Sequence, residues 1–157
     1  MADIEFSGKL SQNHLTGVWE ILSYEVTALN GEKLYPYSLS PKGYLIYTKE
    51  SIMAVQIMHP ERPKHQTPGV ENNDELKRLY NGYIAYFGRY AFDEKQQEVT
   101  HFVEGSLQTW IIDTNQKRAA SFHINSFTDT RLILSAHLSS GRNTRFHEIT
   151  WRRIREK

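Results

Sequence analysis

Eight short β-type segments, separated by turn residues, constrain the fold of this chain more than any other feature. Most are rich in β-branched and aromatic residues with polar residues at alternate positions, which is typical of strands. They cover Gly17–Ala28, Gly43–Thr48, Ser51–Met58, Tyr83–Asp93, Glu98–Leu107, Lys117–Asn125, Thr130–Leu138 and Thr144–Ile154. Because parallel strands need long crossovers, the short connections predict antiparallel neighbours. The sequence therefore predicts an all-β protein with an eight-stranded up-and-down barrel, which leaves no bare sheet edge.

One longer insertion interrupts this series after the third predicted strand. The segment Met58–Asn73 holds three of the five prolines of the chain, which predicts a loop. After it, Asn73 or Asp74 can cap a short helix that ends at Asn81. We expect this loop and helix to cover one mouth of the barrel, because long insertions in compact domains are commonly lids or binding loops.

Composition limits the function classes. The 157 residues are 39% hydrophobic and 12% aromatic, which fits one globular domain with a core. The 19 Lys and Arg against 18 Asp and Glu leave a net charge of +1, so no strong field favours nucleic acid or an acidic membrane surface. The absence of Cys excludes disulfides, thiolate metal sites and a Cys nucleophile.

Targeting signals and domain boundaries are read from the same sequence. No apolar run approaches the roughly 20 residues that span a bilayer. Residues 1–16 lack the apolar stretch of a signal peptide, so we expect a cytoplasmic protein. Residues 1–14 are interpreted as a polar lead-in and residues 15–154 as the barrel domain.

The start of the first predicted strand, Gly17-Val18-Trp19, resembles the Gly-x-Trp signature of lipocalins and related calycin barrels. Longer stretches look like the bacterial and fungal lipocalin-like domain family, over about residues 15–154: Gly43–Thr48, Met58–Pro63, Gly82–Tyr90 and Val99–Leu107. The resemblance implies a calycin-type barrel with an internal pocket. It also implies that Trp19 packs across one end of the barrel against Arg152 or Arg153. Related small barrels bind apolar ligands, and some are isomerases or cyclases, so the resemblance selects no reaction.

His101 and Glu104 are the candidates for acid–base catalysis. On a regular strand, residues three positions apart point to opposite faces, although a bulge near Gly105 would change this. Inside the barrel, burial would raise the pKa of Glu104 toward neutrality and make it a proton donor. The alternative is one buried structural polar group and one solvated one. The lipocalin-like relatives are expected to carry a second His at the position of Phe102, so a role for paired histidines is not expected here.

Arginine and tyrosine side chains are the candidates for ligand binding. An inward Arg89 or Arg118 would need a partner, either Glu104 or an anionic ligand group, whereas an exposed arginine would not. A tyrosine offers a flat apolar face with one hydrogen-bonding tip, although ordinary packing of the barrel is the alternative. The residues expected to bind ligand are Tyr44, Tyr47, Tyr86, Arg89, Tyr90, Ser106, Trp110 and Arg118. Gly88 and Gly105 either make room for a cavity or mark a bend in the barrel.

Three functions follow from these patterns. The leading one is binding of a small, mostly apolar molecule, such as an aromatic or polyketide-like compound, inside the barrel. The second is an isomerase or cyclase that uses proton transfer on such a molecule, and the third is a structural or dimer-forming barrel with a filled interior. The histidines show no metal-binding spacing and the chain has no Gly-rich phosphate loop, so we expect no metal and no cofactor. The expected partner is a small molecule, with no nucleic acid and no membrane.

Overall fold

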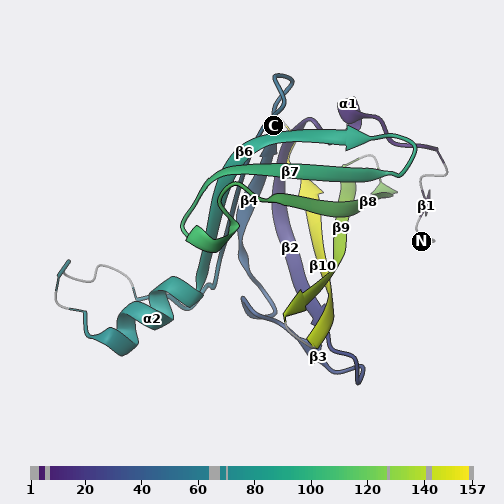
Figure 1. Ribbon diagram of the computed structural model, residues 1–157. Coiled ribbons are helices and arrows are strands. Elements are labelled where there is room, and N and C mark those ends of the chain that lie inside the picture. The colour runs from purple at the N-terminus through teal and green to yellow at the C-terminus, as the bar shows by residue number, and fades with distance from the viewer. Residues whose placement is uncertain are drawn as a thin grey trace.

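Eight long antiparallel strands form a closed barrel in the computed structural model (Figure 1), which describes residues 4–5, 8–63, 68–69, 71–126, 128–140 and 143–155. Each long strand pairs with the next one along the chain, and the last pairs with the first. The strands are β2 (Gly17–Thr27), β4 (Lys42–Tyr47), β5 (Ile52–Met58), β6 (Tyr83–Asp93), β7 (Glu98–Ser106), β8 (Asn115–Ser126), β9 (Asp129–Ser140) and β10 (Asn143–Arg153). The predicted up-and-down barrel is confirmed.

Two short strands and a single turn of 3₁₀-helix complete the strand framework. The strand β1 (Ile4–Glu5) pairs with β8, and β3 (Lys33–Leu34) pairs with β2. The 3₁₀-helix η1 (Thr109–Ile111) connects β7 to β8. No helix in the described part of the chain is long and apolar enough to cross a membrane.

The core lies inside the barrel, because alternate residues of each strand point inward. Trp19, Leu45, Met53, Val99 and Leu132 are at most 1% exposed, and each comes from a different strand. Burial of such apolar surface is the main source of stability for a barrel of this size.

A short helix, α1 (Gln12–Leu15), packs against one end of the barrel. Leu15 is completely buried and Leu10 is 3% exposed, so this segment contributes to the core. The carbonyl oxygen of Leu15 accepts a hydrogen bond of 2.9 Å from the indole nitrogen of Trp19. The polar composition of residues 1–14 gave no sign of this helix.

Arg153 joins this helix to the last strand. Its guanidinium carbon lies 4.2 Å from the centre of the Trp19 ring, a cation–π arrangement. The same guanidinium donates hydrogen bonds to the carbonyl oxygens of His14 and Thr16. Gly17 makes room for it, because a Cβ there would lie 2.7 Å from an Arg153 nitrogen, and its φ of +140° also favours glycine.

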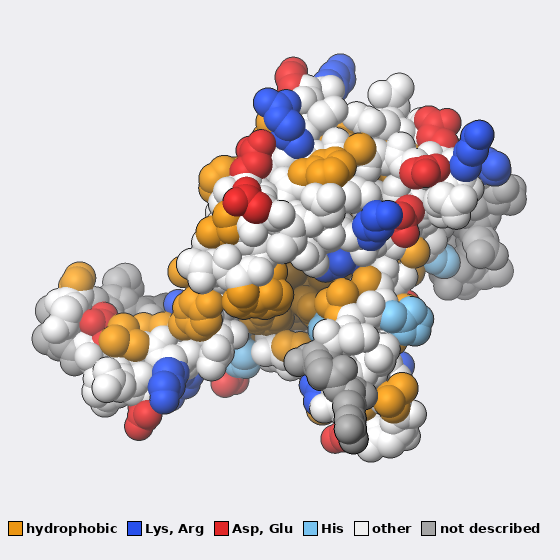
Figure 2. Space-filling view, viewed as in Figure 1, with side chains coloured by type: hydrophobic (Ala, Val, Ile, Leu, Met, Phe, Trp, Pro, Cys, Tyr) orange, Lys and Arg blue, Asp and Glu red, His pale blue; other side chains and the backbone are white. Residues whose placement is uncertain are grey.

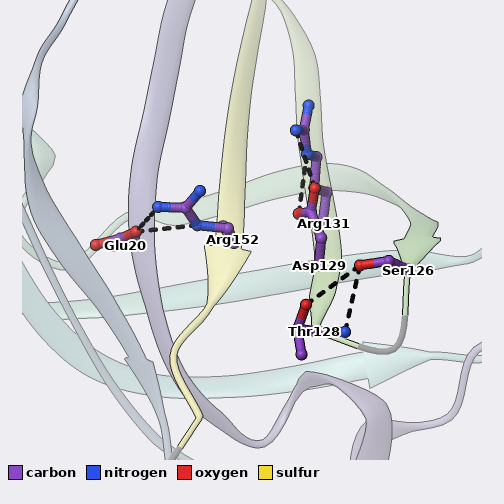
Figure 3. A network of polar contacts seen from close by, with 6 residues as sticks. All are labelled: Glu20, Ser126, Thr128, Asp129, Arg131 and Arg152. Atoms are coloured by element: carbon purple, nitrogen blue, oxygen red, sulfur yellow. Dashed lines mark hydrogen bonds and ion pairs between the residues drawn. The ribbon is translucent and has the colours of Figure 1, made fainter.

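Arg152, the other arginine considered for this contact, lies on the outer face of the barrel. It pairs with Glu20 across the β2–β10 pairing, with 3.0 Å between Nε and the carboxylate oxygen (Figure 3). Nearby, Arg131 and Asp129 form an ion pair of 3.1 Å at the start of β9. Such surface pairs contribute little stability, so Arg153 rather than Arg152 holds the end of the barrel.

A bulge between β6 and β7 explains the two glycines in these strands. The register shifts between Phe87 and Gly88, and a Cβ at Gly88 would lie 1.9 Å from the carbonyl oxygen of Phe102. A Cβ at Gly105 would lie 2.5 Å from the Phe87 ring. Both glycines therefore permit close packing at a bend, and neither lines a cavity.

The second helix, α2 (Asn73–Asn81), projects away from the barrel (Figure 1). Its N-cap is Asn72, whose side chain accepts a hydrogen bond from the backbone of Glu75, so the predicted caps lie one and two residues too late. None of its residues is buried, and Leu76 and Tyr80 are 49% and 40% exposed. The expectation that this helix covers a mouth of the barrel is wrong, because its narrow apolar stripe does not pack on the barrel. Residues 64–67 and 70 of the preceding loop lie outside the described residues.

We predict that Trp19→Ala lowers the free energy of unfolding by about 3–5 kcal/mol, as large-to-small core substitutions do. The change removes the buried ring, the hydrogen bond to Leu15 and the surface on which Arg153 stacks. Trp110→Ala is the matched control, because that ring is 73% exposed and its loss should cost within about 0.5 kcal/mol. Urea unfolding measures both, and equal losses for the two variants would contradict the assigned role of Trp19.

We also predict that backbone amides of α2 exchange hydrogen faster than those of β9. A helix without buried residues can open by itself, whereas β9 opens only with the barrel. Hydrogen exchange followed by mass spectrometry compares the two segments in one sample. Equal protection of α2 and of residues 130–138 would show that the helix is held by contacts that the structure lacks.

Candidate functional site

A cavity of about 50 Å³ lies inside the barrel. This volume holds roughly one or two water molecules, so most of the interior is filled with side chains. The apolar part of its wall is formed by Leu45, Val55, Ile57, Ile84, Leu134 and Ile149. The polar part is formed by Tyr24, Tyr86, His101, Arg118 and Trp151.

The cavity leads to a mouth where β8 and β9 separate. Their pairing ends at Ala119 and Ser135. Beyond that point residues 115–118 pair only with β7, and residues 136–140 pair only with β10. Figure 2 shows a hollow floored by hydrophobic side chains between the β6–β8 side of the barrel and the β9–β10 hairpin. Arg118 is adjacent to Ala119 on the separated part of β8, so it lies at this mouth.

His101 is the centre of a buried polar network. It is 2% exposed, and its Nε2 lies 2.5 Å from the Tyr47 hydroxyl. Its Nδ1 lies 3.1 Å from the Tyr86 hydroxyl. Both ring nitrogens are therefore engaged by phenol groups, which satisfies a polar side chain that would otherwise be costly to bury.

Burial keeps His101 neutral. Desolvation, with a smaller contribution from the positive charge of Arg118, lowers its pKa to about 3. Desolvation also raises the pKa values of Tyr47 and Tyr86, so all three groups are uncharged near neutral pH. The network can orient hydrogen bonds, but it does not provide a group that titrates near neutral pH.

Arg118 brings a positive charge to the mouth. One terminal nitrogen donates to the carbonyl oxygen of Lys117 at 2.8 Å, and the other to the side-chain oxygen of Gln116 at 3.3 Å. Within the described ranges, no carboxylate forms an ion pair with it. An inward arginine without a carboxylate is a place where an anion can bind.

Trp151 brings an unsatisfied donor to the cavity wall. The side chain is 1% exposed, and its indole nitrogen has no hydrogen-bond partner among the described residues. A buried donor without an acceptor costs free energy, and native proteins contain few of them. Because Trp151 is part of the cavity wall, an acceptor is missing within this wall.

A second tyrosine–histidine pair lies at the mouth. The hydroxyl of Tyr24 and Nδ1 of His147 are 2.9 Å apart, and the ring of Tyr37 lies 5.4 Å from that of Tyr24. Burial raises the pKa of Tyr24 and lowers that of His147, so this pair is also uncharged near neutral pH.

Glu104 and Arg89 lie outside the barrel, which corrects their expected placement. Their side chains are 53% and 63% exposed, and they form an ion pair of 3.7 Å on the outer surface. The bulge near Gly105 exists, but Glu104 is the extra residue in it and stays outside. The proton-donor role expected for Glu104 inside the barrel is wrong for this reason.

Two aromatic candidates also lie outside the barrel. Tyr44 is 53% exposed because it alternates with the buried Leu45, and Trp110 is 73% exposed on η1. The expectation that they line the pocket is wrong.

Two further candidates have inward or partly buried side chains but do not line the cavity. Tyr90 is 2% exposed and donates to the carbonyl oxygen of Thr48 at 2.7 Å. Ser106 donates to the carbonyl oxygen of Ala85 at 3.1 Å and accepts from the backbone of Gln108, which fixes the turn after β7. The structure therefore brings Tyr86, His101 and Arg118 together at the cavity, with Tyr47 directly behind His101.

The sequence interpretation missed Tyr24, His147 and Trp151. A usable signal was present in the last strand, where His147, Ile149 and Trp151 alternate with polar residues. This alternation indicates one inward face of the last strand.

The family comparison agrees with this barrel and covers nearly all of it. The model of the lipocalin-like domain matches residues 16–154. The chain belongs to the lipocalin-like domain family. The comparison with curated proteins gave no match. A lipocalin-like barrel suggests small-molecule binding in general. The helix α1, which closes one end of this lipocalin-like barrel, precedes the matched residues.

Within the described ranges, no group of three or more His, Asp and Glu side chains is placed to hold a metal ion. His65 lies outside these ranges.

We predict that His101→Gln reduces the loss of stability at acid pH. The unfolded chain takes up a proton on this histidine near its ordinary pKa of 6.5, whereas the folded protein does so only near 3. Stability therefore falls as the pH is lowered through this window, by up to about 1.4 kcal/mol per pH unit from this group. Urea unfolding from pH 7 to pH 4 should show a smaller slope for the variant. The exposed His137, changed to Gln, is the control, and identical slopes for both variants would contradict a neutral buried His101.

Proposed function

We propose that this lipocalin-like protein binds a small, mostly apolar molecule at the cavity and mouth of its barrel. The observation that carries the proposal is the buried indole nitrogen of Trp151, a residue of the cavity wall, which has no acceptor among the described residues. A wall that served only for packing would satisfy this group or replace it with an apolar one. A bound molecule with a hydrogen-bond acceptor would satisfy it.

The size of the cavity limits how such a molecule can bind. About 50 Å³ accepts only a small group without rearrangement of the side chains. We infer that one end of the ligand enters the cavity, against Leu134 and Ile149, while the rest lies in the mouth. The rings of Tyr24 and Tyr37 would offer apolar faces to an aromatic or polyketide-like body there.

Binding is favoured over the two other functions that the sequence allows. An isomerase or cyclase needs a group that can exchange protons, but Glu104 lies outside and both nitrogens of His101 are engaged. A purely structural barrel agrees with the small cavity. It does not account for an unpaired Trp151 donor and an arginine at the same wall.

We predict that protein purified gently from its own host retains a small molecule, which native mass spectrometry detects as a mass difference. Ile84→Phe should abolish this retention, because a larger ring at the cavity wall fills a space of about 50 Å³. Ile46→Phe is the matched control on the outer face, where the side chain is 39% exposed. Retention by Ile84→Phe equal to that by Ile46→Phe would contradict binding at this cavity.

A further inference from the structure

We infer that the ligand of this barrel carries a carboxylate or a similarly shaped anionic group, and that Arg118 and Trp151 hold this group. The inference rests on the proposed function and adds to it the chemical class of the ligand. The charge and the hydrogen-bonding groups of the cavity wall support it.

The charge of the wall is positive and uncompensated. Of the described residues that line the cavity, Arg118 is the charged one, and none is Asp or Glu. The carboxylates on the neighbouring strand β7 pair elsewhere, Glu98 with Lys117 at 3.9 Å and Glu104 with Arg89 at 3.7 Å. A partly buried guanidinium beside an apolar wall gains most from an anion that binds two of its N–H groups.

The wall also has more donors than acceptors. The indole nitrogen of Trp151 can only donate, and the described part of the chain offers it no acceptor. The guanidinium of Arg118 can only donate, and among the described residues it donates to the carbonyl oxygen of Lys117 and the side-chain oxygen of Gln116. A group that only accepts, such as a carboxylate, therefore matches both residues.

The His101 network supplies a further donor. A neutral histidine donates from one nitrogen and accepts at the other, so it uses the proton of only one of Tyr47 and Tyr86. Tyr47 is 1% exposed and does not line the cavity, so an unused proton there would be buried without an acceptor. We infer that the Tyr47 hydroxyl donates its proton to Nε2 of His101, and that Nδ1 of His101 donates to the Tyr86 oxygen. The Tyr86 proton is then free to donate into the cavity.

The position of Arg118 suits an entering anion. It lies where β8 and β9 separate, so a ligand that enters through this mouth meets the guanidinium before it reaches Trp151. Its positive charge acts on several groups of the site. It lowers the pKa values of Tyr24 and Tyr86, which burial raises, and it adds to the lowering of the His101 pKa by burial. The same field would stabilise a negative charge within the cavity.

Nuclear magnetic resonance of the three tryptophan indole groups tests this inference directly. The indole nitrogen of Trp19 donates to Leu15, Trp110 is 73% exposed, and that of Trp151 has no acceptor, so the three signals report different environments. Assignment follows from the Trp→Phe variants. The probes are benzoate and hexanoate, each compared with its neutral amide, benzamide or hexanamide, at pH 7.

We expect a carboxylate to shift the Trp151 signal downfield and to bind at least about tenfold more tightly than its amide, because charged hydrogen-bond partners are stronger. Comparison of benzoate with hexanoate shows whether the mouth prefers an aromatic or an aliphatic group. Arg118→Gln should remove the preference for the carboxylate, and Arg118→Lys should retain part of it. Arg89→Gln is the matched control, because it removes one positive charge from the outer surface.

The possible outcomes separate this inference from the function on which it rests. Equal affinity for acid and amide, or an unchanged preference in Arg118→Gln, would overturn the anion site and leave small-molecule binding intact. A Trp151 signal that no acid moves, with a molecule retained in native mass spectrometry, would also overturn only the anion site. If no molecule is retained and no probe moves the signal, both proposals fail.

Discussion

The stacking of Arg153 over Trp19 joins three parts of the chain at one end of the barrel. Trp19 lies near the start of the first long strand and Arg153 ends the last one. The carbonyl oxygens of Leu15 and His14 in α1 accept hydrogen bonds from Trp19 and Arg153, respectively. The contact lies where β10 pairs with β2, which is the pairing that closes the barrel. A closed barrel has no unpaired edge around most of its circumference, so its interior can exclude water.

The closed end of the barrel and its cavity differ in how their polar groups are satisfied. At the closed end, the indole nitrogen of Trp19 and the guanidinium of Arg153 both have backbone acceptors. In the cavity wall, the indole nitrogen of Trp151 has no acceptor and Arg118 forms no ion pair among the described residues. Because an unsatisfied buried group costs stability, this difference points to the cavity as the place where a ligand contributes the missing partner.

Local sequence patterns predicted the strands well and the loops and ends poorly. Alternation of apolar and polar residues depends only on the two faces of a strand, so it can be read from consecutive residues. The helix α1 was not predicted, because it is held by contacts with Trp19 and Arg153 that lie outside the helix. Arg153 in particular is distant in the sequence, so the residues of α1 alone do not indicate these contacts. The position of α2 was predicted wrongly. Its apolar stripe of Leu76 and Tyr80 indicates a helix, but it does not indicate whether that helix packs on the barrel.

The sequence by itself determined the class of fold and the order of the strands. It also indicated that an arginine of the last strand stacks on Trp19. It also identified His101, Tyr86 and Arg118 as polar residues of the barrel that need partners. Only the tertiary structure decided that Arg118 lines the cavity while Arg89 and Glu104 lie outside, because closure of the whole barrel determines which face of each strand points inward. It also decided that Trp151 has no acceptor among the described residues, since a hydrogen-bond partner is a neighbour in space that no local pattern specifies.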